Sequence, residues 1–286
     1  MLFRSLAKGT SVIYQETEIA VLYIDGEYWG HYNLRERICK SNICQFEGWE
    51  GNEDDIDLVK ANTNVMQGSN DTMVELLAYV TSHDMNTEEA YRVLDSAIDI
   101  DNYIEYMAVE MYTGNTDTLN VKRYRNPKAD GKWHWVLFDL DWSFSVDTNS
   151  PQRWLTPGGM GNKRRTDNTL FIACMKNQVF ADRFLTFLGD KMATTYSADS
   201  IKAMVEEFYG AIEPLMPDHY ARWEFSESKH RSEIREFVKY AEQRPYRMLQ
   251  FMKYNTYLPL SQTQFEHYFG RVMEQLGVTY DQISKP

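Results

Sequence analysis

Four polar side chains in one short stretch have the residue types that bind metal and phosphate: Asp117, Asn120, Asp139 and Asp141. Mg²⁺ prefers hard oxygen ligands and usually takes one or two carboxylates together with water and substrate phosphates. Asp139, Asp141 and Asn120 meet that requirement, which leaves Asp117 to act as a base. An isolated Asp-x-Asp motif is a weak signal, because Asp117 could cap or turn the chain while the other two aspartates simply leave a sheet.

The elements that would position these side chains are two β-type runs. Residues 119 to 125 and residues 133 to 138 flank a turn that contains Asp130-Gly131, a strong hairpin signal. In an antiparallel hairpin the start of the first strand lies beside the end of the second strand. The sequence therefore predicts that the four polar side chains meet at one edge of a sheet.

The composition is that of a globular chain with a core of ordinary size. The 286 residues are 43% hydrophobic and 25% charged, which fits one large or two small domains. The net charge of −12 argues against nucleic acid as a partner, because the chain has no basic field to displace phosphate counterions. Any phosphate ligand therefore needs locally concentrated positive charge.

Neither a membrane span nor a secretory signal is visible in the sequence. No run of roughly 18 apolar residues occurs, and the start of the chain lacks the apolar segment of a signal peptide. A native signal upstream of Met1 would make the protein secreted or exposed at the cell surface, so localisation stays open. Cys39, Cys44 and Cys174 are an odd set without metal-ligand spacing and are interpreted as ordinary thiols.

A second hairpin is predicted near the N-terminus. Alternating and β-branched residues between positions 19 and 38 flank Asp25-Gly26, and Gly30 indicates a bulge or a close approach by another part of the chain or a ligand. A further short strand is predicted over residues 56 to 62.

Charged residues near the ends of these strands are candidates for nucleotide binding. Arg35 and Glu36 follow the hairpin, and Lys60 is the single cation of the short strand. A lysine there commonly extends to solvent, but kinases also place their phosphate-binding lysine on a strand and orient it with a glutamate. We therefore expect Lys60, Glu36 and Arg35 to bind nucleotide, with Glu36 as the partner of Lys60. A solvated strand edge is the alternative interpretation of the charged cluster.

Apolar residues recur at helical spacing in the rest of the chain. The predicted helices cover residues 72 to 80, 87 to 98, 102 to 112, 197 to 212 and 234 to 241. An Asn86 and Glu89 capping box should begin the second of them, and Gly114 should end the third and lead directly to Asp117. Pro245 should end or kink the last helix.

Two basic features outside these patterns have open interpretations. Lys163, Arg164 and Arg165 lie in a long polar segment, which could close over a substrate or could be a solvated loop. Arg244, next to Pro245, is a candidate for a buried ion pair, as is Arg222 beside a tryptophan.

Blocks of this sequence resemble the CotH kinase family, the spore coat protein H family of atypical protein kinases. They are DGEYWGHYNLRERI, NYIEYMAVEMYTGNTDTLN and GKWHWVLFDLDWSF, followed by a helical block from His219 to Pro245. The resemblance covers about residues 18 to 252. Fewer residues precede the first hairpin than in the family, so part of the nucleotide lobe is expected to be absent or supplied differently.

The predicted fold class is α+β, with an antiparallel sheet in the N-terminal half and a mainly helical C-terminal half around one cleft. The resemblance implies an atypical kinase-like fold in one domain over residues 1 to 286. A β-rich lobe would span 1–66, and a mainly helical lobe would span 67–286 and include the 119–138 hairpin.

The resemblance also implies ATP and a divalent metal, Mg²⁺ or Mn²⁺, as cofactors and roles for individual residues. Asp117 matches the catalytic-loop aspartate of the family and Asp139 its metal-binding aspartate. Asn120 matches the asparagine that follows the catalytic aspartate, at a shorter spacing than in ordinary protein kinases. Neither a G-x-G-x-x-G loop nor a Walker A sequence occurs, so the residues do not support membership of the ordinary kinases or P-loop proteins.

Three functions from different classes agree with the sequence. The leading one is a phosphotransferase that uses ATP and metal to phosphorylate Ser or Thr hydroxyls of a protein acceptor, which would be extracellular or at the cell surface if the chain is exported. The second is an inactive family member that binds glycan or protein through its seven Trp and nineteen Tyr residues. The third is a metal-dependent hydrolase or glycosyltransferase that uses the same Asp-x-Asp motif.

Overall fold

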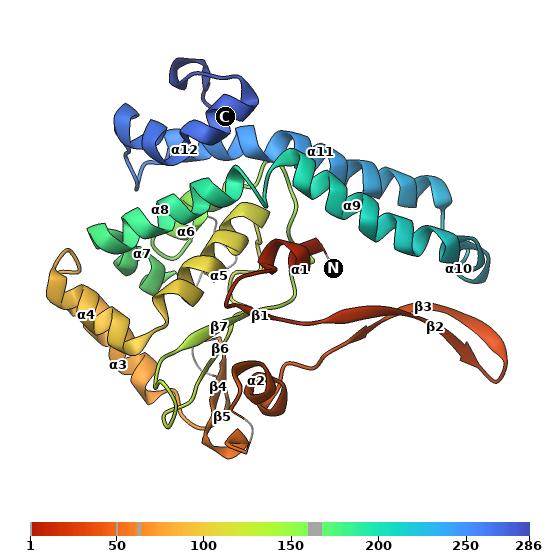
Figure 1. Ribbon diagram of the computed structural model, residues 1–286, viewed down its shortest axis with the longest axis horizontal. Coiled ribbons are helices and arrows are strands. Elements are labelled where there is room, and N and C mark those ends of the chain that lie inside the picture. The colour runs from red at the N-terminus through yellow and green to blue at the C-terminus, as the bar shows by residue number, and fades with distance from the viewer. Residues whose placement is uncertain (1, 50, 62–63, 160–167) are drawn as a thin grey trace.

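The computed structural model describes residues 2–49, 51–61, 64–159 and 168–286, and it shows a body of helices and a sheet from which two long arms extend (Figure 1). The strands are β1 (Ile13–Tyr14), β2 (Thr17–Ile24), β3 (Glu27–Arg35), β4 (Asp57–Lys60), β5 (Asn64–Gln67), β6 (Lys122–Arg125) and β7 (His134–Leu137). The α-helices are α1 (Leu2–Ala7), α2 (Lys40–Glu47), α3 (Asp71–Ser82), α4 (Glu88–Ala97), α5 (Ile100–Thr113), α6 (Ser150–Leu155), α7 (Thr169–Lys176), α8 (Gln178–Met192), α9 (Ala198–Ile212), α10 (Met216–Trp223), α11 (Glu227–Lys253) and α12 (Gln262–Leu276). The predicted α+β class is confirmed.

The sheet of the body has the strand order β1-β7-β6-β4-β5. The predicted hairpin is confirmed as β6 and β7, and Gly131 in its turn has a φ of +71°, a conformation that glycine adopts at least cost. β4 pairs antiparallel with both β5 and β6, but β1 pairs in parallel with β7. The sheet is therefore mixed, whereas the sequence predicted an antiparallel sheet. Strands from the first 67 residues and from the 119–138 hairpin thus form one sheet.

Helix α5 packs at the centre of the body and leads the chain into the polar loop before β6. Asp99 caps its start by accepting a hydrogen bond from the Asn102 amide at 3.0 Å. The side chain of Asn102 is buried and accepts the amide of Trp135 at 2.7 Å, which ties the helix to β7. Gly114 ends the helix as predicted, with a φ of +72°.

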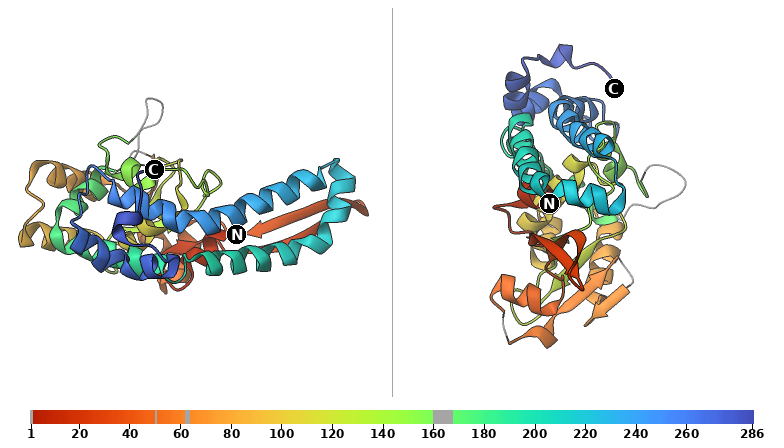
Figure 2. Two further views of the ribbon diagram at one scale, coloured as in Figure 1. Left: turned by 90° about the horizontal axis from the view of Figure 1, so that it is seen from above. Right: turned by 90° about the vertical axis from the view of Figure 1, so that its right-hand side faces the viewer.

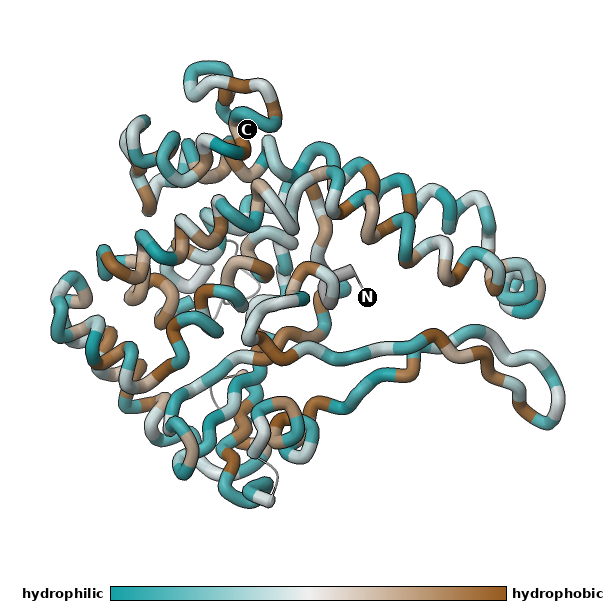
Figure 3. The backbone as a smooth tube through the Cα atoms, viewed as in Figure 1, coloured by the Kyte–Doolittle hydropathy of each residue, from teal (hydrophilic) through white to brown (hydrophobic). Residues whose placement is uncertain are grey.

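The first arm is the hairpin of β2 and β3, which forms a sheet of its own. Asp25 and Gly26 in its turn both have positive φ, 51° and 85°, as a two-residue hairpin turn requires. A bulge interrupts the register at Leu22, which pairs with Gly30, so this prediction is confirmed. Apolar residues along the arm stay partly exposed, including Leu34 at 69% (Figure 3).

The second arm is the helix pair α9 and α11, and α10 at its tip contacts β3 (Figures 1 and 2). Gly30 has a φ of +140°, and a Cβ atom there would lie 3.1 Å from Trp223 Nε1 and 3.3 Å from His219 Nδ1. Trp223 Nε1 donates to the Trp29 carbonyl at 2.9 Å, and Arg222 lies 4.5 Å from the centroid of the Trp29 ring. The close approach predicted at Gly30 is therefore that of α10.

Arg244 is fully buried where α11 joins the body. Its guanidinium donates to the carbonyl oxygens of Tyr112 at 2.8 Å, Val146 at 2.9 Å and Thr148 at 2.8 Å, so backbone carbonyls bind it in place of the expected carboxylate. Helix α11 continues past Pro245, so of the two predicted effects, an end or a kink, the end of the helix at this proline is wrong. Burial of this turn against the body stabilises the helix where the proline removes a hydrogen bond.

Replacing Arg244 with Met should lower the free energy of unfolding by on the order of 3 kcal/mol, because buried carbonyl oxygens would lose their donors. Urea unfolding measures the change. Arg235→Met is the matched control, since Arg235 is exposed on the same helix and its loss should cost less than about 0.5 kcal/mol. Equal stability of the Arg244 and Arg235 variants would refute this role.

One helix start differs from its prediction. Thr87, not Asn86, caps α4, because the Thr87 side chain accepts the amide of Ala90 at 3.1 Å. The start of α9 agrees with the helix predicted from residue 197, because the Ser197 side chain caps it by accepting the Ser200 amide at 3.3 Å. Thr87 has an extended backbone, as an N-cap residue requires, so the true cap is one residue further along the chain.

Two expectations about the whole chain concern membranes and cysteines. Within the described ranges, no helix combines the length and the apolar character that crossing a bilayer requires. Cys39, Cys44 and Cys174 are all described and form no disulfide, in agreement with their interpretation as thiols.

Candidate active site

The pairing of β6 with β7 brings the polar ends of both strands together. Asn120 Nδ2 donates to Asp139 Oδ2 at 2.7 Å. Asp117 lies in the loop between α5 and β6, where its amide donates to Asn115 Oδ1 at 2.9 Å and its carbonyl accepts the Asn120 amide at 3.1 Å. The carboxyl groups of Asp117 and Asp141 are close enough to Asp139 to act on its ionisation. The four predicted side chains therefore form one cluster.

Asp139 has an unusual backbone conformation and a raised pKa. Its φ is +58°, in the left-handed region where Asp and Asn are the best tolerated residues after glycine. Burial raises its pKa, and so does the Asp141 carboxyl group, which shares a hydrogen bond with it. Two neighbouring carboxylates repel each other when both are ionised. A bound cation would remove that repulsion, so the pair is suited to metal binding.

Cations lie on the sheet next to these carboxylates. Lys60 and Lys122 are opposite each other in β4 and β6, and their ammonium groups lie 6.0 and 4.4 Å from the centroid of the Phe138 ring. Burial lowers the pKa of Lys122, and the positive charges of Lys60 and Arg37 lower it further, while Asp139 opposes them. Like charges in directly opposite positions destabilise a sheet.

This cation cluster, Lys60, Lys122 and Arg37, has no carboxylate ion-pair partner among the residues that the structure describes. The chain has a net charge of −12, so acidic residues are abundant elsewhere. A cluster of this kind fits an anionic ligand, and it supplies the local positive charge that a phosphate ligand needs in an acidic chain.

A cavity of about 390 Å³ opens at the same carboxylates. Arg35, Asp139, Asp141 and Ser143 contribute its polar wall, and the rest comes from Leu140, Phe144 and apolar residues of α9 and α11. Arg35 is the last residue of β3, so the hairpin arm delivers a cation to the same carboxylates. The structure thus places Arg35 at the site.

Glu36 lies elsewhere. Its carboxylate accepts the Glu16 amide at 3.1 Å, and its own amide donates to the Glu16 carbonyl at 3.0 Å. The Lys60–Glu36 pair expected from the sequence does not form in the described part of the chain. The physical reason is that Glu36 continues the backbone pairing of the hairpin arm beyond β3, which directs it away from β4.

Glu110 is a buried acid behind the Asp117 loop that the sequence reasoning missed. It is only 3% exposed, and burial raises its pKa to about 7, although hydrogen bonds from Asn115 and Tyr106 stabilise its charged form. The negative charge of Asp117 also raises this pKa. Since Asn115 binds the Asp117 amide too, it connects Glu110 to the loop. A glutamate in the apolar stripe of α5 was the available signal.

Glu110 should make stability depend on pH. Its pKa rises from about 4.5 in the unfolded chain to about 7 in the folded protein, so its stabilising effect is full below pH 4.5 and is lost as pH rises through 7. The free energy of unfolding of Glu110→Gln, taken relative to that of the parent, should therefore be higher at pH 8 than at pH 5 by on the order of 3 kcal/mol. Urea unfolding of both proteins at the two pH values tests this. A difference that does not change with pH would rule out titration of Glu110 in this range.

The residues of the cluster fit a divalent cation that is bound together with phosphate. Asp139 and Asp141 supply neighbouring carboxylates, and Asn120 uses its nitrogen for Asp139, which leaves its amide oxygen to serve as a ligand. Among described residues, no group of three or more His, Cys, Asp or Glu side chains is arranged to hold a metal ion. Mg²⁺ commonly completes its shell with water and phosphate oxygens.

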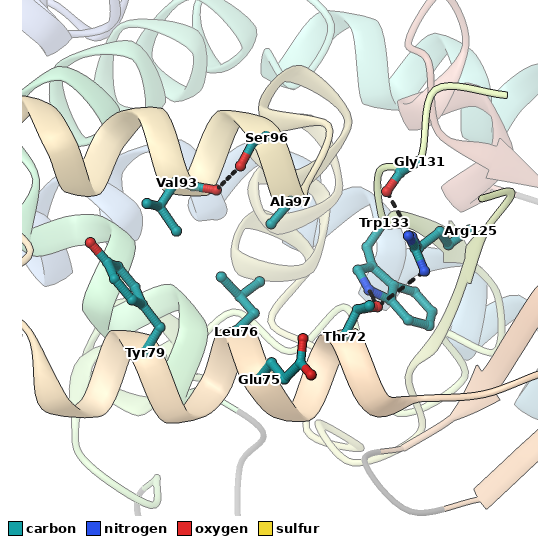
Figure 4. A pocket seen from close by; sticks show the side chains of 10 residues that line it. All are labelled: Thr72, Glu75, Leu76, Tyr79, Val93, Ser96, Ala97, Arg125, Gly131 and Trp133. Atoms are coloured by element: carbon teal, nitrogen blue, oxygen red, sulfur yellow. Dashed lines mark hydrogen bonds between the residues drawn. The ribbon is translucent and has the colours of Figure 1, made fainter. Parts of the chain in front are cut away.

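A second cavity, of about 370 Å³, lies between α3, α4 and the turn of the β6–β7 hairpin (Figure 4). Its cation, Arg125, already donates to the Gly131 carbonyl at 2.7 Å and pairs with Asp57 at 3.3 Å. The turn is at the opposite end of the hairpin from Asp117 and the other site residues, so this cavity is separate from the candidate active site.

Lys163, Arg164 and Arg165 lie outside the described residues, so their predicted position over a substrate stays a prediction. The positive charge that the structure does describe near the carboxylates comes from Arg35 and the cation cluster.

The mixed α+β fold thus brings a cluster of carboxylates close to Lys122 and its neighbour Lys60, an arrangement suited to a metal-bound phosphate ligand. The chain belongs to the CotH kinase family, since the family described as CotH kinase protein matches residues 1–248. No curated protein matches the chain. Membership confirms the resemblance and indicates, in general terms, a kinase-like enzyme with a nucleotide and a protein as substrates.

Proposed function

We propose that this protein is an ATP- and divalent-metal-dependent phosphotransferase that phosphorylates Ser and Thr hydroxyls of proteins. The observation that supports this most strongly is that Asp139, which shares a hydrogen bond with Asp141, is close enough to Lys122 to raise its pKa. Lys122 lies opposite Lys60, and neither lysine has a carboxylate ion-pair partner among described residues. A metal-bound polyphosphate is a ligand that uses both kinds of group at once. Family membership supports the same class of reaction.

The roles of the binding residues follow from their positions. Asp139, Asp141 and Asn120 would hold Mg²⁺ or Mn²⁺, which when bound neutralises charge on phosphate oxygens. Lys60 and Lys122 would bind the phosphates from the sheet side as point charges. The opposed lysines repel each other in the absence of ligand, so phosphate binding also removes an unfavourable interaction.

The remaining residues act on the acceptor side. Asp117 would accept the proton of the acceptor hydroxyl, as a positioned carboxylate does in phosphoryl transfer. The Asn115 side chain holds the Asp117 loop by accepting the backbone amide of Asp117, and buried Glu110 lies behind this loop. Arg35, in the wall of the cavity, would stabilise negative charge on the transferred group.

The melting temperature in the presence of different ligands tests this proposal. ATP with Mg²⁺ or Mn²⁺ at about 100 times its dissociation constant should stabilise the protein by about 2.7 kcal/mol, a shift of several degrees. UDP-sugar or glycan should give no shift. A shift with UDP-sugar and metal but not with ATP would indicate the glycosyltransferase alternative, and a shift with glycan alone would indicate a binding module.

Lys122→Met should weaken ATP binding roughly 10- to 100-fold, because a phosphate loses a charged donor. Calorimetric titration with ATP and Mg²⁺ measures this. The unliganded variant should be at least as stable as the parent, since one of two opposed like charges is gone. Lys128→Met is the matched control, because Lys128 lies in the hairpin turn and pairs with Asp55 at 2.8 Å. Parental affinity in the Lys122 variant would remove this residue from the site.

A further inference from the structure

We propose that the cavity between β3, α9 and α11 binds the acceptor and selects protein segments with a bulky apolar side chain close to the hydroxyl that receives phosphate. This inference rests on the phosphotransferase function proposed above and names the class of its substrate. It depends on the composition of the cavity wall, the fixed position of Phe144 and the location of the cation cluster outside the cavity.

The wall opposite the carboxylates is apolar and incompletely packed. Val205 and Phe208 come from α9, and Ile234 and Phe237 come from α11. Phe208, Ile234 and Phe237 are only half-buried, so they present apolar surface to the cavity. The volume of about 390 Å³ is in the range of pockets that enclose a ligand and exceeds the need of a Ser or Thr side chain. The cavity thus has room for a large apolar neighbour of the hydroxyl.

Phe144 fixes this wall relative to the aspartates. Its φ is +66°, which is rare for a bulky residue and persists only where the surroundings determine it. Its amide donates to the Thr113 carbonyl at 2.8 Å, and its ring lies 5.5 Å from Phe237 and 5.4 Å from Tyr240, centroid to centroid. Phe144 follows Asp141 by only three residues, so its contacts fix the apolar wall close to the aspartates.

The cation cluster lies outside the cavity. Lys60 and Lys122 lie near the Phe138 ring, which precedes Asp139 in the chain, and neither lysine lines the cavity. The donor and the acceptor of a phosphoryl group approach it from opposite directions. If the lysines bind the phosphates outside the cavity, the cavity remains for the acceptor. The base of the nucleotide is separated from its terminal phosphate and does not need a cavity directly at the carboxylates.

Transfer of labelled phosphate from ATP to paired peptides tests the inference. The peptides share one Ser and differ by Phe or Gly at each of the neighbouring positions in turn. The parent protein should use the best Phe peptide at least tenfold more efficiently, in kcat/KM, than its Gly counterpart. Phe208→Ala should reduce that preference to below about threefold by raising KM for the Phe peptide, with KM for ATP changed by less than about twofold.

A second variant and a control complete the design. Ile234→Trp should fill the cavity, so that it impairs use of the Phe peptide more than use of the Gly peptide. Phe46→Ala is the matched control, because Phe46 is 52% exposed on α2 and lines a different pocket, and its loss should preserve the preference.

Three outcomes would overturn the inference. Equal use of both peptides by the parent protein would show that the cavity does not select the acceptor. A rise of KM for ATP in Phe208→Ala, with KM for the peptide unchanged, would assign the cavity to the nucleotide base and leave the proposed function intact. Failure of the parent protein to transfer phosphate to any peptide would overturn the proposed function together with the inference.

Discussion

Asp139→Asn should abolish metal-dependent ATP binding and phosphate transfer, with a loss of at least about a hundredfold, while the protein folds as the parent does. The change removes a hard anionic ligand at almost constant side-chain volume. Asn is also well tolerated at the φ of +58° that this position requires, so the backbone should not change. The Asn120 amide, which donates to Asp139 Oδ2 at 2.7 Å in the parent, can still donate to the remaining side-chain oxygen.

Asp25→Asn provides a matched control for this change. Asp25 also has a left-handed backbone, with a φ of 51°, and it lies at the turn of the hairpin arm. Its substitution should leave ATP binding and transfer at the parental level. Calorimetric titration with ATP and Mg²⁺, combined with a transfer assay, measures both variants. If Asp139→Asn turned over ATP at the parental rate, the assignment of Asp139 to the metal would have to be abandoned.

Asp117→Ala should separate binding from chemistry. If Asp117 accepts the proton of the acceptor hydroxyl, the variant should bind ATP and metal with nearly parental affinity and transfer phosphate roughly a hundredfold more slowly or worse. The loop should keep its shape, because Asn115 binds the backbone amide of Asp117 and the Asn120 amide binds its carbonyl. Neither of these contacts involves the Asp117 side chain.

A purely structural role for Asp117 predicts a different result. Loss of a cap should cost on the order of 1 kcal/mol and should lower activity only in step with the folded fraction. Asp99→Ala is the reference for loss of a cap and should show this pattern, since Asp99 caps α5 by accepting the Asn102 amide. Melting and transfer are measured on the same preparations of both variants. Transfer by Asp117→Ala at the parental rate would leave the base unidentified.

The β6–β7 hairpin and its polar cluster were predictable because local signals determine them. The Asp130-Gly131 turn and the β-type runs on both sides set the pairing, and antiparallel pairing alone places Asn120 beside Asp139. The helices were predictable from their apolar spacing, although their exact caps were not, as Thr87 shows. The family resemblance added the roles, which the spacing alone left open.

Features that depend on contacts between distant segments were not predictable. The opposed position of Lys60 and Lys122 requires β4 to pair with β6, and nothing in either strand specifies that partner. Glu36 has the residue type that an ion pair with Lys60 requires, but its carboxylate accepts the backbone amide of Glu16 instead. The continuation of α11 past Pro245 depends on the burial of that turn, which overrides the local preference of proline.

Incorporation of label from ATP that is radioactive at either its γ- or its α-phosphate tests the central claim most directly. The protein is incubated with Mg²⁺ and a Ser/Thr peptide library, and the labelled amino acids are identified after acid hydrolysis. We expect label from γ-labelled ATP on phosphoserine or phosphothreonine, none from α-labelled ATP, and a hundredfold lower rate in Asp117→Ala. Label from α-labelled ATP, or none from either form, would contradict the account of this protein as a phosphotransferase.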